Sequence, residues 1–196
     1  MMAEDHRTPV RDASTVVLLR DGSDGLEVWL QQRSHSLVFA GGMYAFPGGA
    51  VDGDDALAAF DAQVLDAHVG VWGESGDRVS SFLAAAVRET FEECGVELSA
   101  ASLRPWSRWV TPAGPPRRFD AWFFVAPVPV GQRPQPLTGE VAGASWVVVR
   151  SAVEREAAGD LPMWPPTIAT LTELAAFDSV AEVLAAVPPR VEAVTG

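Results

Sequence analysis

The sequence predicts an α/β fold, in which helices cover a β-sheet, and three observations support that prediction. Residues 14–20 and 26–33 are β-rich runs on either side of a turn cluster. Residues 80–94 repeat their apolar side chains at the spacing of an amphipathic helix. Further helical patterns follow a last apolar run at 140–149. A chain of 196 residues can bury a substantial core, so we expect a single domain spanning 1–196.

The first part of the chain is predicted to form a β-hairpin. Its two runs flank the turn-forming segment Asp21-Gly22-Ser23-Asp24-Gly25, and residues 26–33 alternate like a half-buried strand. A loop from 34 to 42 then leads to a short strand at 43–46. That strand runs into Pro47-Gly48-Gly49, a sequence typical of a tight turn.

The second part of the chain is predicted to supply more strands and then the closing helices. Strands at 103–111 and 118–125 are separated by a loop rich in proline and glycine, and the last strand is 140–149. Helices are expected at 151–158, after Pro165-Pro166, and from a cap at Asp178 to residue 186. The C-terminal helices, within 151–186, belong to the same domain.

The composition excludes several classes of function. The net charge is −12, which argues against a nucleic-acid surface because a polyanion would be repelled. All 14 basic residues are arginine, so lysine-based phosphate loops and Schiff-base chemistry are ruled out. No run is long enough to span a membrane, and the N-terminus lacks an apolar leader. We expect a cytoplasmic protein, and the absence of lysine and asparagine favours a bacterial, GC-rich genome.

The helix predicted at 80–94 has two different faces. Leu83, Val87, Phe91 and Cys94 form an apolar stripe, and Cys94 is the only cysteine in the chain. Ser80 or Ser81 is expected to cap the start of the helix, and Gly95 suits the left-handed residue that ends it.

The opposite face of this helix carries three carboxylates, those of Glu89, Glu92 and Glu93. Residues at i, i+3 and i+4 are neighbours on a helix, so these side chains repel one another unless a cation lies among them. Oxygen-only ligands of this kind suit Mg²⁺ or Mn²⁺. The alternative is an acidic face that is simply solvated.

The surrounding residues resemble a known family signature. Gly49 and the segment from Arg88 to Val96 are similar to the Nudix hydrolase signature, G-x5-E-x7-R-E-U-x-E-E-x-G-U, where U is apolar. Asp55 stands where the first glutamate is expected, and 32 residues rather than seven separate it from Arg88. The signature is therefore interrupted by an insertion of 25 residues, which we place within 54–79.

The insertion itself has a helical pattern. Its apolar residues Leu57, Phe60, Val64 and Leu65 predict a helix over 55–68, followed by a glycine-rich loop. We expect either a cover over the cleft or a contact between two copies in a homodimer. His68 is expected on the surface of the insertion rather than at a metal.

The Nudix resemblance implies an α/β/α sandwich with a mixed β-sheet, and a hydrolase that cleaves a nucleoside diphosphate linked to another moiety. It implies Glu92 and Glu93 as metal ligands, Glu89 as a ligand or general base, and a contribution from the main-chain carbonyl of Gly48 or Gly49. Many members also have a metal-contacting glutamate in a loop that Glu140 occupies here.

Arg88 has a different expected role in this resemblance. It is more suited to bracing the ligand helix through a carboxylate than to touching substrate. Three acidic residues are candidates for that carboxylate: Asp55, Glu74 and Asp77.

A second resemblance concerns the substrate. Arg33-Ser34, Gly42 and Phe46-Pro47-Gly48-Gly49 are spaced as in L-L-T-x-R-S-x3-R-x3-G-x-V-x-F-P-G-G, a motif of Nudix enzymes that cleave coenzyme A. Val38 replaces the second arginine of that motif, and Tyr44 replaces its valine. The resemblance implies coenzyme A or an acyl derivative as the substrate. ADP-ribose or a nucleotide sugar, and a non-catalytic ligand-sensing domain, are the alternatives.

The strand at 118–125 supplies further candidate substrate contacts. The segment around Arg117, Arg118 and Phe119 is similar to one in the insertion-bearing coenzyme A branch. A guanidinium can bind a phosphate through two hydrogen bonds. The alternative is a pair of surface arginines at the start of a strand.

Overall fold

The central element of the fold is the long strand β1 (Val10–Gly22), which makes neighbours of segments far apart in the sequence. The computed structural model describes residues 8–35 and 41–195, and within them the sheet has eight strands in a mixed arrangement. β1 pairs antiparallel with β2 and parallel with β6. The strand order is β3-β2-β1-β6-β5-β8, with β4 paired to β1 and β7 paired to β2. The other strands are β2 (Gly25–Arg33), β3 (Tyr44–Ala45), β4 (Gly48–Ala50), β5 (Arg104–Val110), β6 (Arg118–Pro127), β7 (Val141–Val148) and β8 (Ala193–Thr195).

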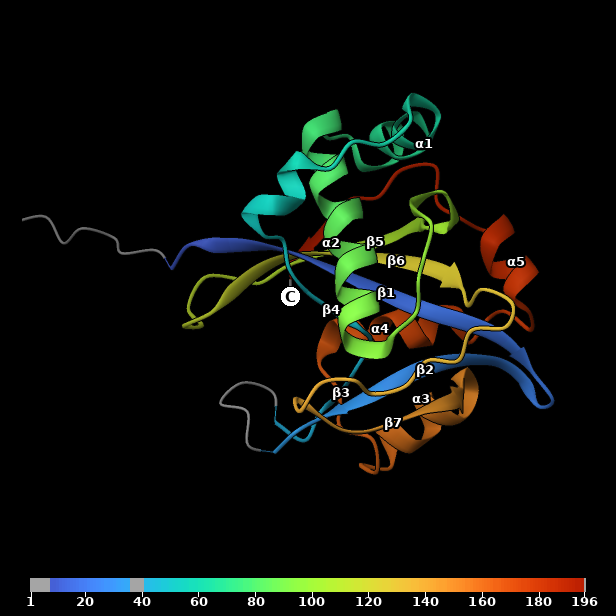
Figure 1. The fold of residues 1–196 in the computed structure, drawn as a ribbon. Helices are drawn as coiled ribbons and strands as arrows, with labels where there is room; N and C mark the ends of the chain where they lie inside the picture. The colour runs from blue at the N-terminus through green and yellow to red at the C-terminus, as the bar shows by residue number, and fades with distance from the viewer. Residues whose placement is uncertain (1–7, 36–40, 196) are drawn as a thin grey trace, which may run out of the picture.

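Both faces of this sheet are covered by helices (Figure 1). Alternate residues of β1 enter different cores: Val16 and Leu18 pack toward one helical layer, and Val17 and Leu19 toward the other. The first layer contains α1 (Ala62–Trp72) and α2 (Gly76–Cys94). The second contains α3 (Val149–Ala157), α4 (Pro165–Leu174) and α5 (Val180–Ala185). The predicted α/β/α sandwich with a mixed sheet is confirmed.

The strands of the hairpin are longer than their local composition indicates. β1 begins at Val10 rather than at Ser14, because its first residues pair with β6 from Arg118 onward. The strands β4 and β8 were not predicted at all. Each has only three residues, and each is defined by its pairing with β1 or β5 rather than by its own sequence pattern.

Helix α2 begins earlier than predicted. Its N-cap is Ser75, whose hydroxyl accepts a hydrogen bond from the main-chain N–H of Arg78 at 3.3 Å. The prediction of a cap at Ser80 or Ser81 is wrong: Gly76 lies in the first turn and makes that turn look like a loop. The C-terminal prediction is confirmed, since Gly95 ends the helix with φ of 69°.

The predicted apolar stripe of α2 is buried or half-buried except at Phe91. Leu83 and Cys94 are fully buried, whereas the side chain of Phe91 is 49% exposed. An exposed phenylalanine on a helix that is otherwise well packed is a feature that the periodicity cannot reveal.

The insertion differs most from the sequence prediction. Residues expected to form one helix at 55–68 instead form the 3₁₀ helix η1 (Gly53–Leu57), an irregular link, and then α1. A second short 3₁₀ helix, η2 (Ala100–Ser102), follows α2. α1 runs on to Trp72 because Gly73 adopts the left-handed conformation that terminates it, with φ of 65°.

The insertion is anchored in the core by aromatic and ionic contacts. The Trp72 ring stacks on Trp122 of β6 with centroids 4.2 Å apart, and Phe82 of α2 stacks on Trp122 at 3.8 Å. Next to this stack, the carboxylate of Glu74 accepts hydrogen bonds from Arg78 at 2.9 Å and from Arg108 at 2.7 Å. The C-terminal part of the insertion is therefore integral to the hydrophobic core.

The last helix also starts one residue later than predicted. The hydroxyl of Ser179 accepts a hydrogen bond from the N–H of Glu182, and the Glu182 carboxylate accepts one from the N–H of Asp178. Asp178 is thus the residue before the cap. Among the described residues, no helix is long and apolar enough to cross a membrane.

His68 was expected at the surface and is instead 2% exposed. Its ring packs edge-on against Phe124 with centroids 5.9 Å apart, because α1 turns this residue toward the sheet. Burial, together with the nearby charge of Arg104, lowers the pKa of His68 to about 4.

We predict that this histidine makes the protein less stable as the pH falls. The folded-state pKa of about 4 lies below the ordinary 6.5, so the unfolded chain binds more protons between these values. The free energy of unfolding should fall across this window by up to about 3 kcal/mol from this residue. Urea titrations of the wild type and His68→Leu at pH 7.5 and 4.5 should show a smaller loss in the variant. His35→Gln, at an exposed histidine, should behave like the wild type, and equal losses in all three proteins would contradict the prediction.

Candidate active site

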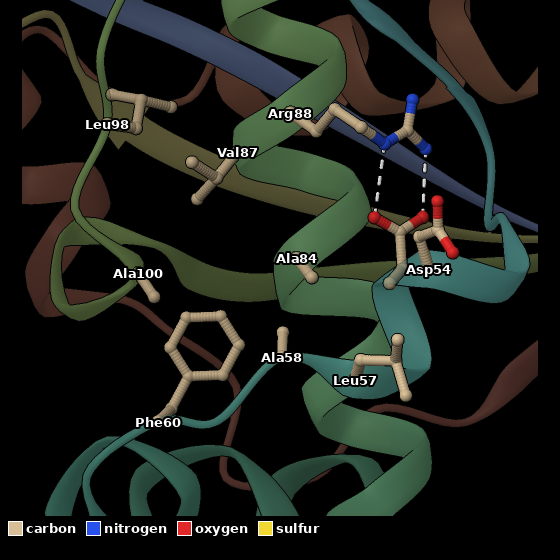
Figure 2. A pocket seen from close by; sticks show the side chains of 10 residues that line it. Asp54, Leu57, Ala58, Phe60, Ala84, Val87, Arg88, Leu98 and Ala100 are labelled. Carbon is tan, nitrogen blue, oxygen red and sulfur yellow. Dashed lines mark hydrogen bonds and ion pairs between the residues drawn. The ribbon is translucent and has the colours of Figure 1, made fainter.

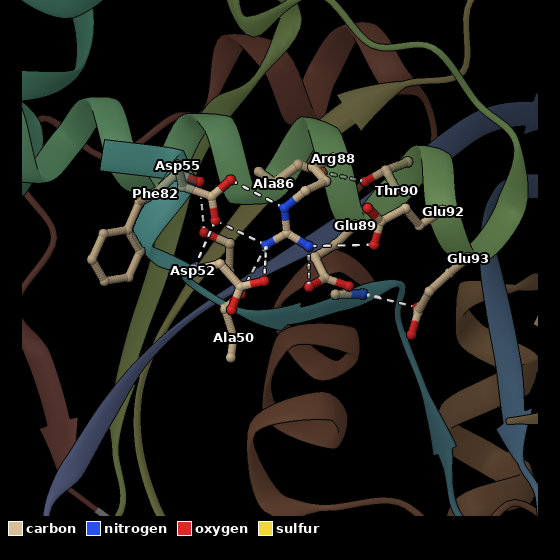
Figure 3. A network of polar contacts seen from close by, with 12 residues as sticks. Ala50, Asp52, Asp55, Phe82, Ala86, Arg88, Glu89, Thr90, Glu92 and Glu93 are labelled. Atoms are coloured by element: carbon tan, nitrogen blue, oxygen red, sulfur yellow. Dashed lines mark hydrogen bonds and ion pairs between the residues drawn. The ribbon is translucent and has the colours of Figure 1, made fainter. Parts of the chain in front are cut away.

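The C-terminal half of α2 brings its acidic face against strand β4 (Figure 3). Gly48 and Gly49, which the sequence placed in a tight turn, belong to that strand. The main-chain N–H of Gly48 donates a hydrogen bond to the Glu93 carboxylate at 3.1 Å. A Cβ at Gly49 would overlap the Glu89 carboxylate, and a Cβ at Gly48 would overlap the main-chain oxygen of Ser14. Gly49 is therefore needed for α2 to approach β4 this closely, and Gly48 for β4 to approach β1.

Arg88 is the centre of the polar network in Figure 3. Its guanidinium donates two hydrogen bonds to the Asp55 carboxylate, at 3.1 and 2.8 Å. It also donates to Glu89 at 2.8 Å, to Glu92 at 3.3 Å and to the carbonyl of Ala50 at 3.0 Å. Its role as a brace for the ligand helix, rather than a substrate contact, fits this geometry.

The partner of Arg88 that the sequence left open is Asp55. The Asp55 side chain is only 5% exposed, whereas Glu74 pairs with Arg78 and Arg108 instead. Burial raises the pKa of Asp55, but hydrogen bonds from Arg88 and from the Asp52 N–H outweigh it and leave that pKa below its ordinary value. Asp55 is one carbon shorter than the glutamate of the Nudix signature. It still reaches Arg88, because η1 places it directly against α2.

The glutamates of the cluster have different proton affinities. Burial, with smaller contributions from the carboxylates of Glu89 and Glu140, raises the pKa of Glu93 to about 7, against the opposing effects of the Gly48 N–H and the charge of Arg33. Burial also raises the pKa of Glu89, although Arg88 opposes the shift. Neighbouring carboxylates with separated pKa values are a common arrangement for acid–base chemistry.

The end of β2 and the loop before β7 add three of the predicted site residues to this cluster. The main-chain N–H of Ser34 donates to the carbonyl of Glu140 at 2.6 Å, which fixes the loop before β7 next to Arg33. Arg33 and Glu140 are also close enough to influence the pKa of Glu93. Arg33, Ser34 and Glu140 therefore gather with Glu93 and Gly48.

Arg117, Arg118 and Phe119 lie at another part of the sheet. Arg118 pairs with Val10 on β1 whereas Gly48 pairs with Thr15, a separation of roughly 17 Å along the strand. The Arg118 guanidinium donates to the carbonyls of Thr111, Pro112 and Thr8, which braces the loop before β6. Phe119 is half-buried and Arg117 is exposed. Val38 lies outside the described residues.

The acidic cluster fits a divalent metal by the chemistry of its donors, because its side chains offer only carboxylate oxygens. In the part of the chain that the structure describes, no three His, Cys, Asp or Glu side chains converge on a common point. Arg88 holds Glu89 and Glu92, while Glu93 turns toward Gly48. Each of these bonds uses one oxygen of a carboxylate, so metal binding would require the glutamates to turn their other oxygens toward a common point.

Three residues beside the cluster have buried polar atoms that the sequence analysis did not identify. Gln31 Nε2, Arg33 Nε and Thr138 Oγ1 are buried without a hydrogen-bond partner among the described residues. Such groups are costly unless a water or ligand satisfies them. Gln31 could have been found, since it alternates with Arg33 onto the same face of β2. Thr138 gave no signal in the sequence.

Comparison with known proteins shows the family. A family model described as the NUDIX domain matches residues 66–166, about half of the chain. The chain belongs to the Nudix family. Members of this family generally use divalent metal ions, which agrees with the donor chemistry of the cluster.

Individual Nudix relatives agree with that assignment. A curated relative, putative nudix hydrolase 7 of Caenorhabditis elegans, is 29% identical over 163 residues; the match covers 75% of this chain and 55% of that protein. A Nudix hydrolase structure from Alicyclobacillus acidocaldarius superposes with a TM-score of 0.77 at 27% identity, covering 92% of this chain and 97% of the other. The complex of a C. elegans Ap4A hydrolase shares the fold, with a TM-score of 0.55 at 17% identity and coverages of 85% and 96%.

We predict that Asp55 is needed for stability, whereas its neighbour Asp54 is not. Asp55→Ala leaves a partly buried Arg88 without its main partner and should lower the free energy of unfolding by about 1–3 kcal/mol, discounted for the remaining Glu89 and Glu92 contacts. Asp54→Ala removes an exposed carboxylate of the same 3₁₀ helix and should change it by less than about 0.5 kcal/mol. Urea denaturation at pH 7.5 measures both, and equal stabilities would show that the Asp55–Arg88 pair contributes nothing.

Proposed function

We propose that this protein is a metal-dependent hydrolase that cleaves the diphosphate linkage of a nucleoside diphosphate joined to another moiety. The observation that carries the proposal is the cluster of Glu89, Glu92 and Glu93 on α2, packed against Gly48 and Gly49 of β4. Its ligand would be a small-molecule nucleotide derivative. An acidic cleft on a chain of net charge −12 binds such an anion only when a cation neutralises both.

Each residue of the cluster has a distinct proposed role. Glu92 and Glu93 would be the principal ligands of Mg²⁺ or Mn²⁺, with Glu89 as a further ligand or as the general base, and Glu140 and the carbonyl of Gly48 as additional donors. When bound, the metal would neutralise the diphosphate and activate the attacking water. Arg88 orients Glu89 and Glu92 through its ion pairs, and its own position is fixed by Asp55.

Coenzyme A or an acyl derivative is the first proposed substrate. Arg33 and Ser34, which carry half of the coenzyme A-type motif, lie beside Glu93 and Glu140, where a guanidinium could bind a substrate phosphate. Arg117, Arg118 and Phe119 could serve only a substrate long enough to reach the start of β6. ADP-ribose or a nucleotide sugar needs the same cluster with a different pocket and is the alternative.

The remaining proposals concern the protein as a whole. We propose one Nudix domain over residues 1–196, interrupted by the 54–79 insertion, acting in the cytoplasm of a bacterium. A homodimer is a possible assembly of that domain. A non-catalytic sensing role is disfavoured, because such domains usually accompany a DNA-binding module and a net charge of −12 argues against a nucleic-acid surface.

Replacing one metal ligand tests the proposal directly. Glu93→Gln keeps the shape of the side chain and removes its charge, so hydrolysis should fall by at least about 100-fold. Glu97→Gln makes the same change at an exposed position just after α2 and should retain activity. Hydrolysis by Glu93→Gln at the wild-type rate in saturating Mg²⁺ or Mn²⁺ would refute the assignment.

The same substitution should lower activity without lowering the thermal stability of the metal-free protein. The folded-state pKa of Glu93, about 7, lies above the ordinary 4.5, so its carboxylate destabilises the metal-free fold at pH values above this window. In EDTA at pH 8, Glu93→Gln should therefore unfold at the same or a higher temperature than the wild type. The difference should shrink at pH 4.5, where both side chains are neutral.

A further inference from the structure

An open groove of about 550 Å³ lies between the insertion and the catalytic helix, and the proposed function does not use it. Its walls come from three segments of the chain, as Figure 2 shows: η1 and the link after it, α2, and the turn that leads to η2. Most of the lining is apolar. The residues that matter for the argument are Leu57, Ala58, Phe60, Ala84, Val87 and Leu98.

This groove adjoins the acidic cluster. Arg88 and Asp55 form one end of it, and the other side of the same guanidinium contacts Glu89 and Glu92. On α2, Ala84, Arg88 and Glu92 follow at intervals of four residues and share one face, so the groove begins roughly 6 Å from Glu92. The exposed Phe91 ring lies on this side of the helix, one turn beyond Val87.

The groove exposes apolar side chains that the described protein does not cover. Leu57 is 82% exposed although it lies on a short, well-defined 3₁₀ helix. The volume of the groove falls within the range of small-molecule sites. All five N–H groups of Arg88 face protein oxygens, so the end of the groove presents the aliphatic part of that side chain rather than a free charge.

We propose that this groove binds an aliphatic segment of the substrate, on the moiety that leaves with the second phosphate of the diphosphate. The inference rests on the proposed function, because that function places the diphosphate at Glu89, Glu92 and Glu93. A chain extending from there along α2 meets Val87, Leu57 and Phe60 in turn. The insertion is then a specificity element: it supplies one wall of the groove.

A second copy of the protein is a poorer occupant of this surface. In a twofold dimer the same patch meets itself, and the patch is bordered by the carboxylates of Asp52, Asp54 and Glu92. Their mutual approach would be repulsive in a chain of net charge −12. An aliphatic chain carries no charge and meets no such opposition.

The test uses adenosine diphosphate esters with an ethyl, hexyl or decyl group on the terminal phosphate. The nucleotide and the diphosphate stay constant, so only burial of the chain varies. For the wild type with Mg²⁺ or Mn²⁺, kcat/KM should rise about two- to fourfold per added methylene until the groove is filled. The ethyl ester sets the baseline.

Two groove variants and one matched control decide the outcome. Leu57→Ser removes an apolar wall and Ala84→Phe fills the groove; both should lose the preference for hexyl over ethyl while hydrolysing the ethyl ester normally. Val130→Ser makes a comparable change at a fully exposed residue away from the groove and should keep the preference. A flat chain-length dependence in the wild type, or an undiminished one in Leu57→Ser, would overturn the inference.

Binding measurements separate this inference from the proposed function. Calorimetry in Mg²⁺ with methylene-bridged, non-hydrolysable ethyl and decyl analogues measures what the chain adds to binding when no bond can be cleaved. Tighter binding of the decyl analogue that Leu57→Ser abolishes supports the groove even if no ester is cleaved, in which case only the hydrolase proposal fails. If both analogues bind equally and Leu57→Ser converts a wild-type dimer to a monomer in sedimentation, the groove is a subunit interface and the inference is wrong.

Discussion

The ion pair between Arg88 and Asp55 is the contact on which the candidate site depends. It joins η1 to α2 through two hydrogen bonds, and the remaining N–H groups of the same guanidinium reach Glu89, Glu92 and the carbonyl of Ala50. Without this guanidinium, Glu89 and Glu92 would lose the cation that offsets the repulsion among the carboxylates on one helix face. The pair also shapes the groove, because the same two residues close one of its ends.

A second set of charges connects the insertion to the sheet. Arg78 and Arg108 share the carboxylates of Glu74 and Asp120, beside the stacked rings of Trp72, Trp122 and Phe82. Burial raises the pKa of Asp120, but the two arginines outweigh it and leave that pKa below its ordinary value. The end of the insertion next to α2 is thus held rigidly, whereas the exposed Leu57 and the groove lie at its beginning. The end of the insertion next to α2 therefore packs on the core, and its beginning lines the proposed binding groove.

The parts of the fold that could be predicted are those with a local signal. The amphipathic pattern of α2 and its glycine C-cap placed the acidic face opposite the core. The signature residues likewise placed Gly48 and Gly49 beside the glutamates. The parts that could not be predicted depend on distant partners. β4 and β8 exist only through pairing, the start of α2 is set by Ser75 beyond a glycine, and His68 is buried by contact with Phe124.

The site shows the same division. Asp55 could be named as a candidate partner of Arg88 but not chosen over Glu74, because the choice depends on where the insertion folds. Arg33, Ser34 and Glu140 converge through the pairing of β2 with β7, while Arg118 is drawn into the loop before β6. The candidate site residues therefore separate into a group at the acidic cluster and a group distant from it.

The central claim is that the glutamates braced by Arg88 form a metal-dependent centre for diphosphate hydrolysis. The most direct measurement is phosphorus-31 NMR of the wild-type protein with coenzyme A, ADP-ribose and a nucleotide sugar, each with Mg²⁺ or Mn²⁺ and with EDTA. The account predicts that the two coupled diphosphate resonances of at least one compound are replaced by two phosphomonoester resonances, only when metal is present. Intact diphosphate resonances for every compound in the presence of metal, or cleavage that continues in EDTA, would contradict it.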